Sequence, residues 1–446
     1  MTIHNQPVRT AAEDQLLATL DARVAQDTLS GPLAARIGEV REAALAAFRE
    51  NGLPHRRVEE WKYTDLRALM RDAFAPITTL GDGAAAEGHL RAVSFPGARR
   101  IVFVNGVLAR QHSDLVGLEP GLSVMPLSSA IAKGHGAVEK LGTLAPQRYD
   151  GALALNTAFL GEGLVIHVAD GATIARPLHI AHVFTLDDAA ATYSRSLVDV
   201  GVGASFTLVE SFQGRAGVAY QQNDAIELFA GDDSHVDYIR LQEEGDKAIH
   251  LGTFMADIGR DAKFHTFGLT SGAQVARLSV YGRFSGTGSQ AGLRGVTLLK
   301  GRQHADVTLL LDHAVAHCES RELFKTVLAD ESHGVFQGKI VVRPDAQKTD
   351  GRMMSQALLL GETAEMDNKP ELEIFADDVQ CGHGATAGDL DEDLLFYLKA
   401  RGIPAKEAEA MLIQAFVGEA LEFVENDDLR DSLIARAEAW LKTRAA

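Results

Sequence analysis

A long series of short segments rich in β-forming residues, starting near residue 99, constrains the fold of this chain more than any other feature. Segments such as RRIVFVNGVL, ASFTLVESF, ARLSVYGRF and GVFQGKIVVRP are separated by glycine and polar residues as far as about residue 388. Only PQRYDGALALNTAFLG interrupts them with a helical pattern, which argues against alternating strand–helix units. The central region should therefore be built from β-strands.

Two all-β architectures are compatible with this series: stacked sandwiches or barrels, and a β-helix in which each coil stacks on the one before. The uneven spacing of the strands, the glycines in most turns and the unbroken length favour the β-helix. Periodicity alone leaves the choice open, because no exact repeat length is visible. The expected fold class is mainly β, with a β-helix as the favoured architecture.

Helical patterns occupy both ends of the chain. Near the N-terminus, AAEDQLLATLDARVAQ and GPLAARIGEVREAALAAFRENG space apolar residues at helical intervals. Three later segments carry capping residues and charges that suit helix ends: DEDLLFYLKARG, PAKEAEAMLIQAFVGEALEFV and DDLRDSLIARAEAWLKTR. We therefore predict an N-terminal helical domain over residues 1–95, a β core over 96–388 and a C-terminal helical domain over 389–446.

Two groups of apolar residues in the helical regions should pack against the rest of the chain. Trp61 and Tyr63 are expected to anchor the N-terminal domain on the β core. In the middle C-terminal helix, the apolar residues that share one stripe are Ala408, Met411, Leu412, Ala415, Phe416, Ala420 and Phe423. This stripe should pack within the chain, and a docking surface for a partner is the alternative.

The charge of the chain limits its class of function. The 446 residues carry 43 basic and 61 acidic side chains, a net charge of −18, which argues against binding to nucleic acid or anionic lipid. The sequence shows neither a secretory signal pattern nor a segment long and apolar enough to span a membrane. We expect a cytoplasmic protein in which Cys318 and Cys381 are free thiols.

Familiar catalytic motifs are missing. The glycine-rich segments GTGSQAG and GVFQGKI match neither a phosphate loop nor a dinucleotide fingerprint, so the chain should bind no ATP itself. The G-x-S-x-G motif of serine hydrolases is also missing. Neither ATP hydrolysis nor serine-hydrolase activity is therefore expected of this chain.

Metal binding is the chemistry that remains. Two groups offer thiol and imidazole ligands: His304, His313, His317 and Cys318 in QHADVTLLLDHAVAHCES, and Cys381 and His383 in VQCGHGAT. Such ligands suit iron, zinc, copper or iron-sulfur clusters, but buried cysteines and turn histidines without a metal are the alternative.

The second group has the sharper geometry. In an extended strand Cys381 and His383 project from the same face, and Gly382 and Gly384 leave backbone room for something large. Two ligands are too few for an iron-sulfur cluster, which generally takes about four. If Cys381 and His383 bind a cluster, another subunit has to complete the site.

A long C-terminal run carries a resemblance to a known family. Residues 336–404, from FQGKIVVRP through VQCGHGATAGDL to KARGIP, closely resemble the core signature of the SufB/SufD family of iron-sulfur cluster assembly scaffolds. SRELFKTVLAD at 320–330 and RRVEEWKYTDL at 56–66 resemble the same family. The SufB branch tends to carry extra cysteines and reads H-E-A-T, so two cysteines and HGAT favour the SufD branch.

The resemblance implies a right-handed parallel β-helix between helical domains, paired with SufB, with one copy of the ATPase SufC on each subunit. It implies that His383 lies at the SufB interface and helps a SufB cysteine to hold iron or a nascent iron-sulfur cluster. Cys381 matches the motif cysteine, and the helices from about Asp391 match the region that docks SufC. A cysteine-desulfurase system would supply sulfur, and the isolated chain could form a homodimer.

By this resemblance, the chain is a non-catalytic scaffold that passes its cluster to acceptor proteins. The alternative is a purely structural subunit that positions SufC and stabilises SufB without supplying a ligand. A third possibility is an independent metal-binding β-helix that associates with no ATPase.

Overall fold

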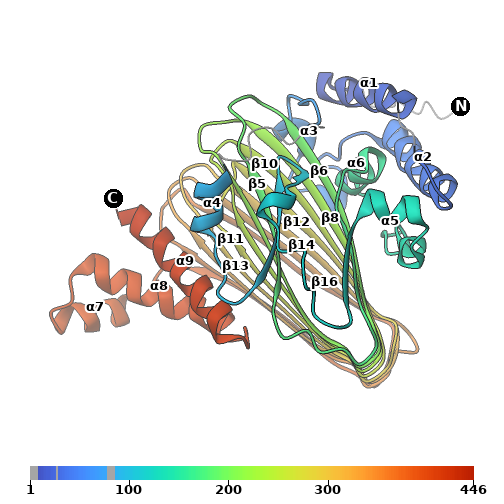
Figure 1. Cartoon of the computed structure of the whole chain (residues 1–446). Helices are drawn as coiled ribbons and strands as arrows, with labels where there is room; N and C mark the ends of the chain where they lie inside the picture. Colours follow the sequence, from blue (N-terminus) through green and yellow to red (C-terminus); the bar gives the residue numbers. More distant parts are fainter. Residues whose placement is uncertain (1–8, 27–28, 78–85, 446) are drawn as a thin grey trace, which may run out of the picture.

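Two parallel β-sheets wind around a common core and form the body of the molecule (Figure 1). The computed structural model describes residues 9–26, 29–77 and 86–445. From β4 onward, successive strands alternate between the two sheets, and each pairs in parallel with the strand two places along the chain. This arrangement is a parallel β-helix, as predicted, so the sandwich and barrel alternatives are wrong.

The strands follow one another along the axis of the β-helix in both sheets. In spatial order, the ten-stranded sheet contains β19 (Gln380–Gly388), β17 (Asp350–Leu359), β15 (Glu319–Leu328), β13 (Gln290–Leu299), β11 (Lys263–Thr270), β9 (His235–Glu243), β7 (Ser205–Gly214), β5 (Leu178–Phe184), β1 (Arg99–Val104) and β2 (Val107–Leu108). The nine-stranded sheet contains β18 (Glu365–Ile374), β16 (His333–Val342), β14 (His304–His313), β12 (Val275–Phe284), β10 (Ala248–Ile258), β8 (Tyr220–Ala230), β6 (Ala191–Val200), β4 (Leu164–Val168) and β3 (Leu122–Pro126).

Side chains on the inner faces of the coils stack directly on one another. Phe206, Val236 and Phe264 are partners in register on consecutive coils, and each is almost completely buried. Because parallel pairing repeats the same face from coil to coil, an apolar residue in one coil meets apolar residues in the next. The core of the β-helix is therefore a set of continuous apolar columns.

The helices lie outside the two sheets (Figure 1). Those that precede β4 are α1 (Ala11–Gln26), α2 (Ala34–Asn51), η1 (Glu59–Trp61), α3 (Leu66–Leu69), α4 (Ala86–Ala92), η3 (Arg110–His112), α5 (Leu127–Lys133), η4 (Gly136–Lys140) and α6 (Gly151–Phe159). The C-terminal helices are α7 (Glu392–Ala400), α8 (Ala405–Leu421) and α9 (Asp427–Ala445). Helix α6 packs on the nine-stranded sheet and α1 and α2 pack on α6, whereas α8 and α9 pack on the ten-stranded sheet (Figure 1). With helices outside and the core inside, the middle strands are buried on both faces.

Helices also occur within the region, residues 96–388, that was predicted to consist mainly of strands. Helix α6 lies in PQRYDGALALNTAFLG, and the Asp150 side chain caps it by accepting hydrogen bonds from the Ala152 and Leu153 amides. Helix α5 was not predicted, because a helix of so few residues shows little periodicity. No helix in the described part of the chain combines the length and apolarity needed to cross a membrane. The three domain limits stay predictions.

Trp61 ties the N-terminal segment to the β-helix. Its side chain is 1% exposed, and the guanidinium carbon of Arg277 on β12 lies 3.8 Å from the centroid of its ring. Arg277 also forms a buried ion pair with Asp306 and donates a hydrogen bond to the Glu60 carbonyl. Trp61 is therefore an anchor, as predicted, whereas Tyr63 stays partly exposed.

Helix α8 buries a different line of side chains from the predicted stripe. Ile413, Val417 and Leu421 follow one another at intervals of one helical turn and are buried. Met411 and Ala415 are exposed, because a shift of two residues turns a side chain to the opposite side of a helix. The prediction that the stripe packs within the chain is therefore wrong for Met411 and Ala415, and its other members are buried or partly buried.

Replacing Arg277 tests the anchor. Arg277→Met should lower the free energy of unfolding by about 3–5 kcal/mol, because it leaves Asp306 as an unpaired buried charge. Adding Asp306→Asn should recover part of the loss, because the orphaned charge is then removed. Urea unfolding of the single and double variants measures both effects. Equal stability of the two variants would contradict this role of the ion pair.

Candidate metal centre

The last coil of the β-helix has no neighbour on one side. Strands β18 and β19 end their sheets: among the described strands, β18 is paired with β16 and β19 with β17. Residues of β18 and β19 are exposed or partly exposed, whereas most residues of β16 are buried. A free strand edge carries unpaired backbone N–H and C=O groups, which can pair with another chain.

Cys381 and His383 lie on β19, in this open coil. In the register with β17, Cys381 is opposite Gly351, and His383 is opposite Met353, which is buried in the core. The Cys381 side chain is half-buried against the core, whereas His383 is exposed because no further coil covers it. Burial raises the pKa of the Cys381 thiol. The two candidate ligands therefore differ: the imidazole is accessible and the thiol is partly buried.

The glycines beside His383 differ in their surroundings. A methyl group added at Gly382 would meet no atom within 4 Å, so the predicted space exists there. At Gly384 the same methyl group would lie 3.1 Å from the sulfur atom of Met354. The prediction of free space at Gly384 is wrong, because the Met354 side chain fills it.

A pocket of about 680 Å³ opens beside the two candidate ligands. It lies between strands β13 to β19 of the ten-stranded sheet and helix α8. The side chains in its lining that carry charge or metal-binding groups include Arg294, Arg321, Arg352, Glu322, Cys381 and His383. Of its three arginines, Arg321 and Arg352 each form an ion pair with Asp350.

Glu322 is a site residue that the sequence did not single out. It is 3% exposed and lies next to Met353 in the register between β15 and β17. Burial raises the pKa of Glu322 to about 8, so the carboxyl group is protonated near pH 7. The chain has too many carboxylates for one to be chosen from sequence. The alternation of side chains along β15 could have identified Glu322 as buried. Glu322 lies two residues from Phe324, a core residue, and so projects from the same face of the strand.

The lining of the pocket therefore contains a thiol, an imidazole and a carboxyl group, with Met353 between Glu322 and His383 in the register. These groups bind iron and other transition metals. They are fewer than the four protein ligands that an iron-sulfur cluster generally takes, and the open coil leaves the other side of the site uncovered. This geometry suits a site that a second chain completes.

The other predicted group of ligands does not come together. His304 and His313 are the first and last residues of β14, so about 30 Å of extended chain separates them. Cys318 is completely buried, with its sulfur 3.4 Å from the Gly286 carbonyl oxygen. His317 is exposed in a turn. The hypothesis of a metal site formed by these residues is wrong, because sequence proximity along a strand is not spatial proximity.

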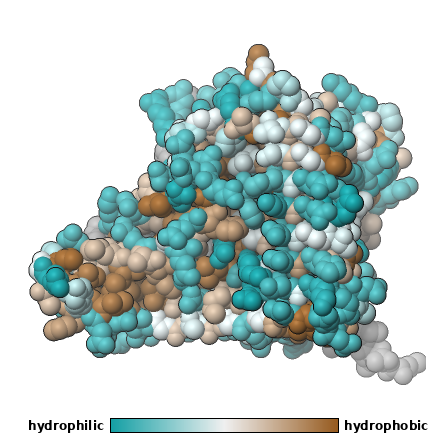
Figure 2. All heavy atoms as spheres, turned by 90° about the horizontal axis from the view of Figure 1, so that it is seen from below, coloured by the Kyte–Doolittle hydropathy of each residue, from teal (hydrophilic) through white to brown (hydrophobic). Residues whose placement is uncertain are grey.

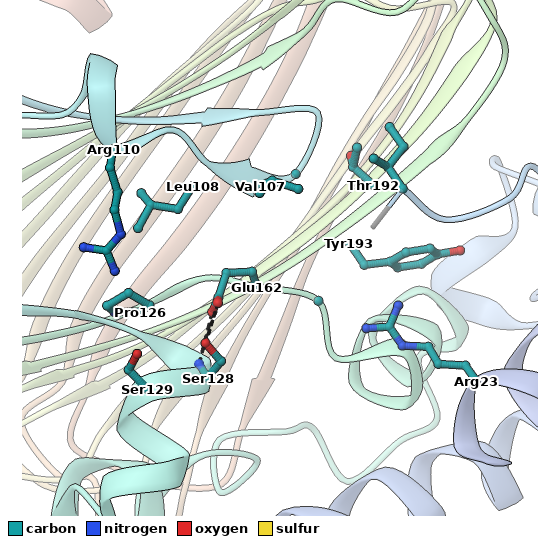
Figure 3. Close-up of a pocket in the computed structure, with 13 residues that line it drawn as sticks. Arg23, Val107, Leu108, Arg110, Pro126, Ser128, Ser129, Glu162, Thr192 and Tyr193 are labelled. Carbon is teal, nitrogen blue, oxygen red and sulfur yellow. Dashed lines mark hydrogen bonds between the residues drawn. The ribbon is translucent and has the colours of Figure 1, made fainter. Parts of the chain in front are cut away.

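A second hollow, of about 420 Å³, lies beside the N-terminal helices (Figure 3). Arg23, Arg110 and Tyr193 are among its lining residues, and Glu162 accepts hydrogen bonds from the Ser128 hydroxyl and amide at 2.6 and 3.1 Å. Its described lining contains neither cysteine nor histidine. This hollow therefore lacks the soft ligands that the pocket at β19 provides.

Helix α7 exposes large apolar side chains away from the β-helix. Leu394 is 51%, Phe396 72% and Tyr397 55% exposed, and we call these three residues the α7 surface. Figure 2 shows hydrophobic side chains gathered on the projecting C-terminal helices. Asp391 caps α7 by accepting a hydrogen bond from the Leu394 amide at 2.9 Å. An apolar surface of this kind commonly marks a protein–protein contact.

Two family models match the chain. Residues 183–416 match the model described as SUF system FeS cluster assembly, SufBD core domain, and residues 14–180 match the SufBD protein N-terminal region. The iron-sulfur cluster assembly protein SufD of Escherichia coli is 29% identical over 400 residues, which cover 88% of this chain and 90% of the relative. An iron-sulfur cluster assembly SufBD family protein of Synechocystis is 29% identical over 90% of this chain and 91% of the relative. The chloroplastic protein ABCI7 of Arabidopsis thaliana is 25% identical over 91% and 90%.

The two cysteines should differ in reactivity. In the native chain a thiol reagent should modify Cys381, more slowly than a free cysteine because its raised pKa leaves less thiolate, and should spare the buried Cys318. Titration with a chromogenic disulfide should count one thiol in the native chain and two in denaturant. Cys381→Ala should remove the native reaction and Cys318→Ala should keep it; a native reaction of Cys318 would contradict the structure.

Glu322→Gln should change how stability depends on pH. The unfolded chain ionises this group near its ordinary pKa of 4.5, whereas the folded chain keeps it protonated up to about pH 8, so Glu322 lowers stability as the pH rises between these values. The variant should match the wild type near pH 4.5 and exceed it at pH 8 by about 4 kcal/mol. Urea unfolding across this range measures the difference.

Glu362→Gln, at an exposed turn, is the matched control for this measurement. It removes a carboxylate of the same type without changing a buried group, so its stability should follow the wild type at every pH. If the free energy of unfolding depends on pH in the same way for Glu322→Gln and the wild type, Glu322 is ionised in the folded chain.

Proposed function

Because the chain belongs to the SufBD family of iron-sulfur cluster assembly proteins, we propose that it is a non-catalytic scaffold subunit for cluster assembly. A nascent cluster would be held at the open end of its β-helix and then passed to acceptor proteins. The observation that carries this proposal is the position of Cys381 and His383 on an uncovered coil, where ligands of a second chain can reach the same cargo.

We propose a SufB chain as the partner that covers β18 and β19. The free edges of both strands support this proposal, because they offer backbone groups for pairing with a second β-helix. His383 would bind the iron or cluster through a ring nitrogen, Cys381 through its sulfur after loss of the proton, and SufB would supply the other ligands. In isolation, the same edges could receive a second copy of this chain.

The α7 surface is the proposed docking site for the ATPase SufC. Its exposed apolar side chains support this role, and the chain has no phosphate loop of its own, so SufC would bind the ATP. The ATPase cycle can act on the cluster site only if SufC binds two states of the scaffold with different affinity. A cysteine-desulfurase system as the sulfur source and a cytoplasmic location are further parts of the proposal.

A purely structural subunit is the alternative function. In that case the chain would position SufC and stabilise SufB, and its thiol and imidazole would bind no iron. The raised pKa of the half-buried Cys381 thiol favours this alternative for Cys381, because a metal ligand has to be a thiolate. This argument does not apply to His383, because its side chain is exposed.

His383→Ala should leave the complex assembled and sharply reduce cluster formation, because an exposed imidazole supplies a ligand but little packing energy. The measurement is anaerobic reconstitution of the co-expressed complex with iron and sulfide, followed by iron analysis and visible absorption. The control is His317→Asn, which replaces an exposed histidine outside the pocket and suits the left-handed backbone at that turn. If Cys381→Ala/His383→Ala forms clusters at the wild-type yield, the chain is a structural subunit.

Phe396→Asp should weaken binding to SufC by at least about tenfold, because it puts a charge in the middle of the apolar contact. The stability of the chain itself should not change, since Phe396 is 72% exposed. Calorimetric titration with SufC measures the affinity. Val116→Asp is the matched control, because Val116 is an apolar residue, 87% exposed, outside the C-terminal helices. Equal affinity of Phe396→Asp and Val116→Asp would place the SufC contact elsewhere.

A further inference from the structure

Two histidines and two carboxylates meet where the C-terminal helices rest on the ten-stranded sheet. His235 and Asp237 are two residues apart on β9, so both project from the same face. His265 of β11 is the direct partner of Asp237 in the next coil. Glu425, from the connection between α8 and α9, completes the group. This group shares no residue with the pocket at β19, whose lining strands are β13 to β19.

The possible ligand atoms of this group are close together. One ligand atom from each of His235, His265 and Glu425 lies within 4.8 Å of the other two. Asp237 Oδ1 lies 3.3 Å from His265 Nδ1 and 3.6 Å from His235 Nε2. Ligands held about 2.1 Å from a tetrahedral zinc ion lie about 3.4 Å from one another, so small side-chain movements would bring these atoms onto one ion.

The surroundings of the group also suit a bound ion. Asp237, His265 and Glu425 line a cavity of about 20 Å³, which has room for a single ion or water molecule. His235 Nε2 is buried and has no hydrogen-bond partner among the described residues. Burial alone would raise the pKa of Asp237, but His235 and His265 lower it to about 2, and the contact with Asp237 in turn raises the pKa of His235. A metal ion at this site would therefore have to displace the proton of His235.

We propose that His235, Asp237, His265 and Glu425 bind one divalent transition metal ion, with Zn²⁺ as the best fit. Two imidazoles and two carboxylates form the nitrogen and oxygen ligand set that zinc accepts. The ion would join the α8–α9 connection to the β-helix, where the Phe423 ring already packs edge-on against His265 with centroids 4.7 Å apart. The site therefore links metal binding to the position of the C-terminal helices, independently of the proposed function.

The test measures zinc binding by the full chain in a Cys381→Ala/His383→Ala background, so that these two side chains contribute no ligands. Equilibrium dialysis and metal analysis should find one zinc ion per chain, and saturating Zn²⁺ should raise the melting temperature, because the ion binds only the folded state. His235→Asn, His265→Asn and Glu425→Gln should each weaken zinc binding by at least about tenfold and remove the rise in melting temperature.

The matched control is His167→Asn. His167 makes a contact with Asp199 of the same length, 3.3 Å, on the nine-stranded sheet, outside the proposed site, so its replacement should leave zinc binding unchanged. Melting temperatures without zinc show whether the variants fold, and Glu425 is exposed, so Glu425→Gln tests the site with little risk to the core. Failure of the parent to bind zinc, or equal binding by the parent and all three site variants, overturns the proposal.

Discussion

In-register parallel pairing between coils is the interaction on which the rest of this structure depends. Each middle coil satisfies its backbone groups on the coils before and after it, and each inner side chain stacks on its counterparts. The two ends of such a stack are not equivalent here. At the first end, β2 and β3 add antiparallel strands to the sheets. At the other end β18 and β19 have no such cover among the described residues, and this difference places the candidate metal centre.

The outer faces of the stack determine where the helices rest. At Gly292 of β13 an added methyl group would lie 2.1 Å from the ring of Phe423, so a side chain there would push away the chain that follows α8. Phe423 also stacks on Arg294 and contacts His265. The position of the C-terminal helices therefore depends on a few close contacts with the ten-stranded sheet, and the proposed zinc site lies among them.

Much of the fold could be predicted from sequence, because β-forming segments and turn residues report on local structure. The repeat could not be recognised in the sequence, because the turns differ in length from coil to coil. Ile249 pairs with Val275, whereas His333 pairs with Glu365, which follows it by a larger number of residues. Cys381 and His383 could be recognised together because they share one strand. The alternation along β15 marks Glu322 as a buried residue, but only the register of the folded chain places it in their pocket.

The register between coils also explains the other differences between the predictions from sequence and the structure. His235, Asp237 and His265 come from two coils, so their proximity depends on which residues pair between β9 and β11. Met354 fills the space beside Gly384 from a neighbouring coil. His304 and His313, in contrast, are close in sequence and far apart in space, because the strand between them is extended.

The burial of Cys381 and Glu322 makes the open end of the β-helix sensitive to acidity. Burial raises the pKa of both groups, so each carries its proton near neutral pH. A metal ion binds a thiolate or a carboxylate, and each of these ligands has to release its proton first. In the proposed function, capture of iron by Cys381 would therefore be an exchange of cations, in which a proton leaves as the metal arrives. Lower pH would drive this exchange backwards.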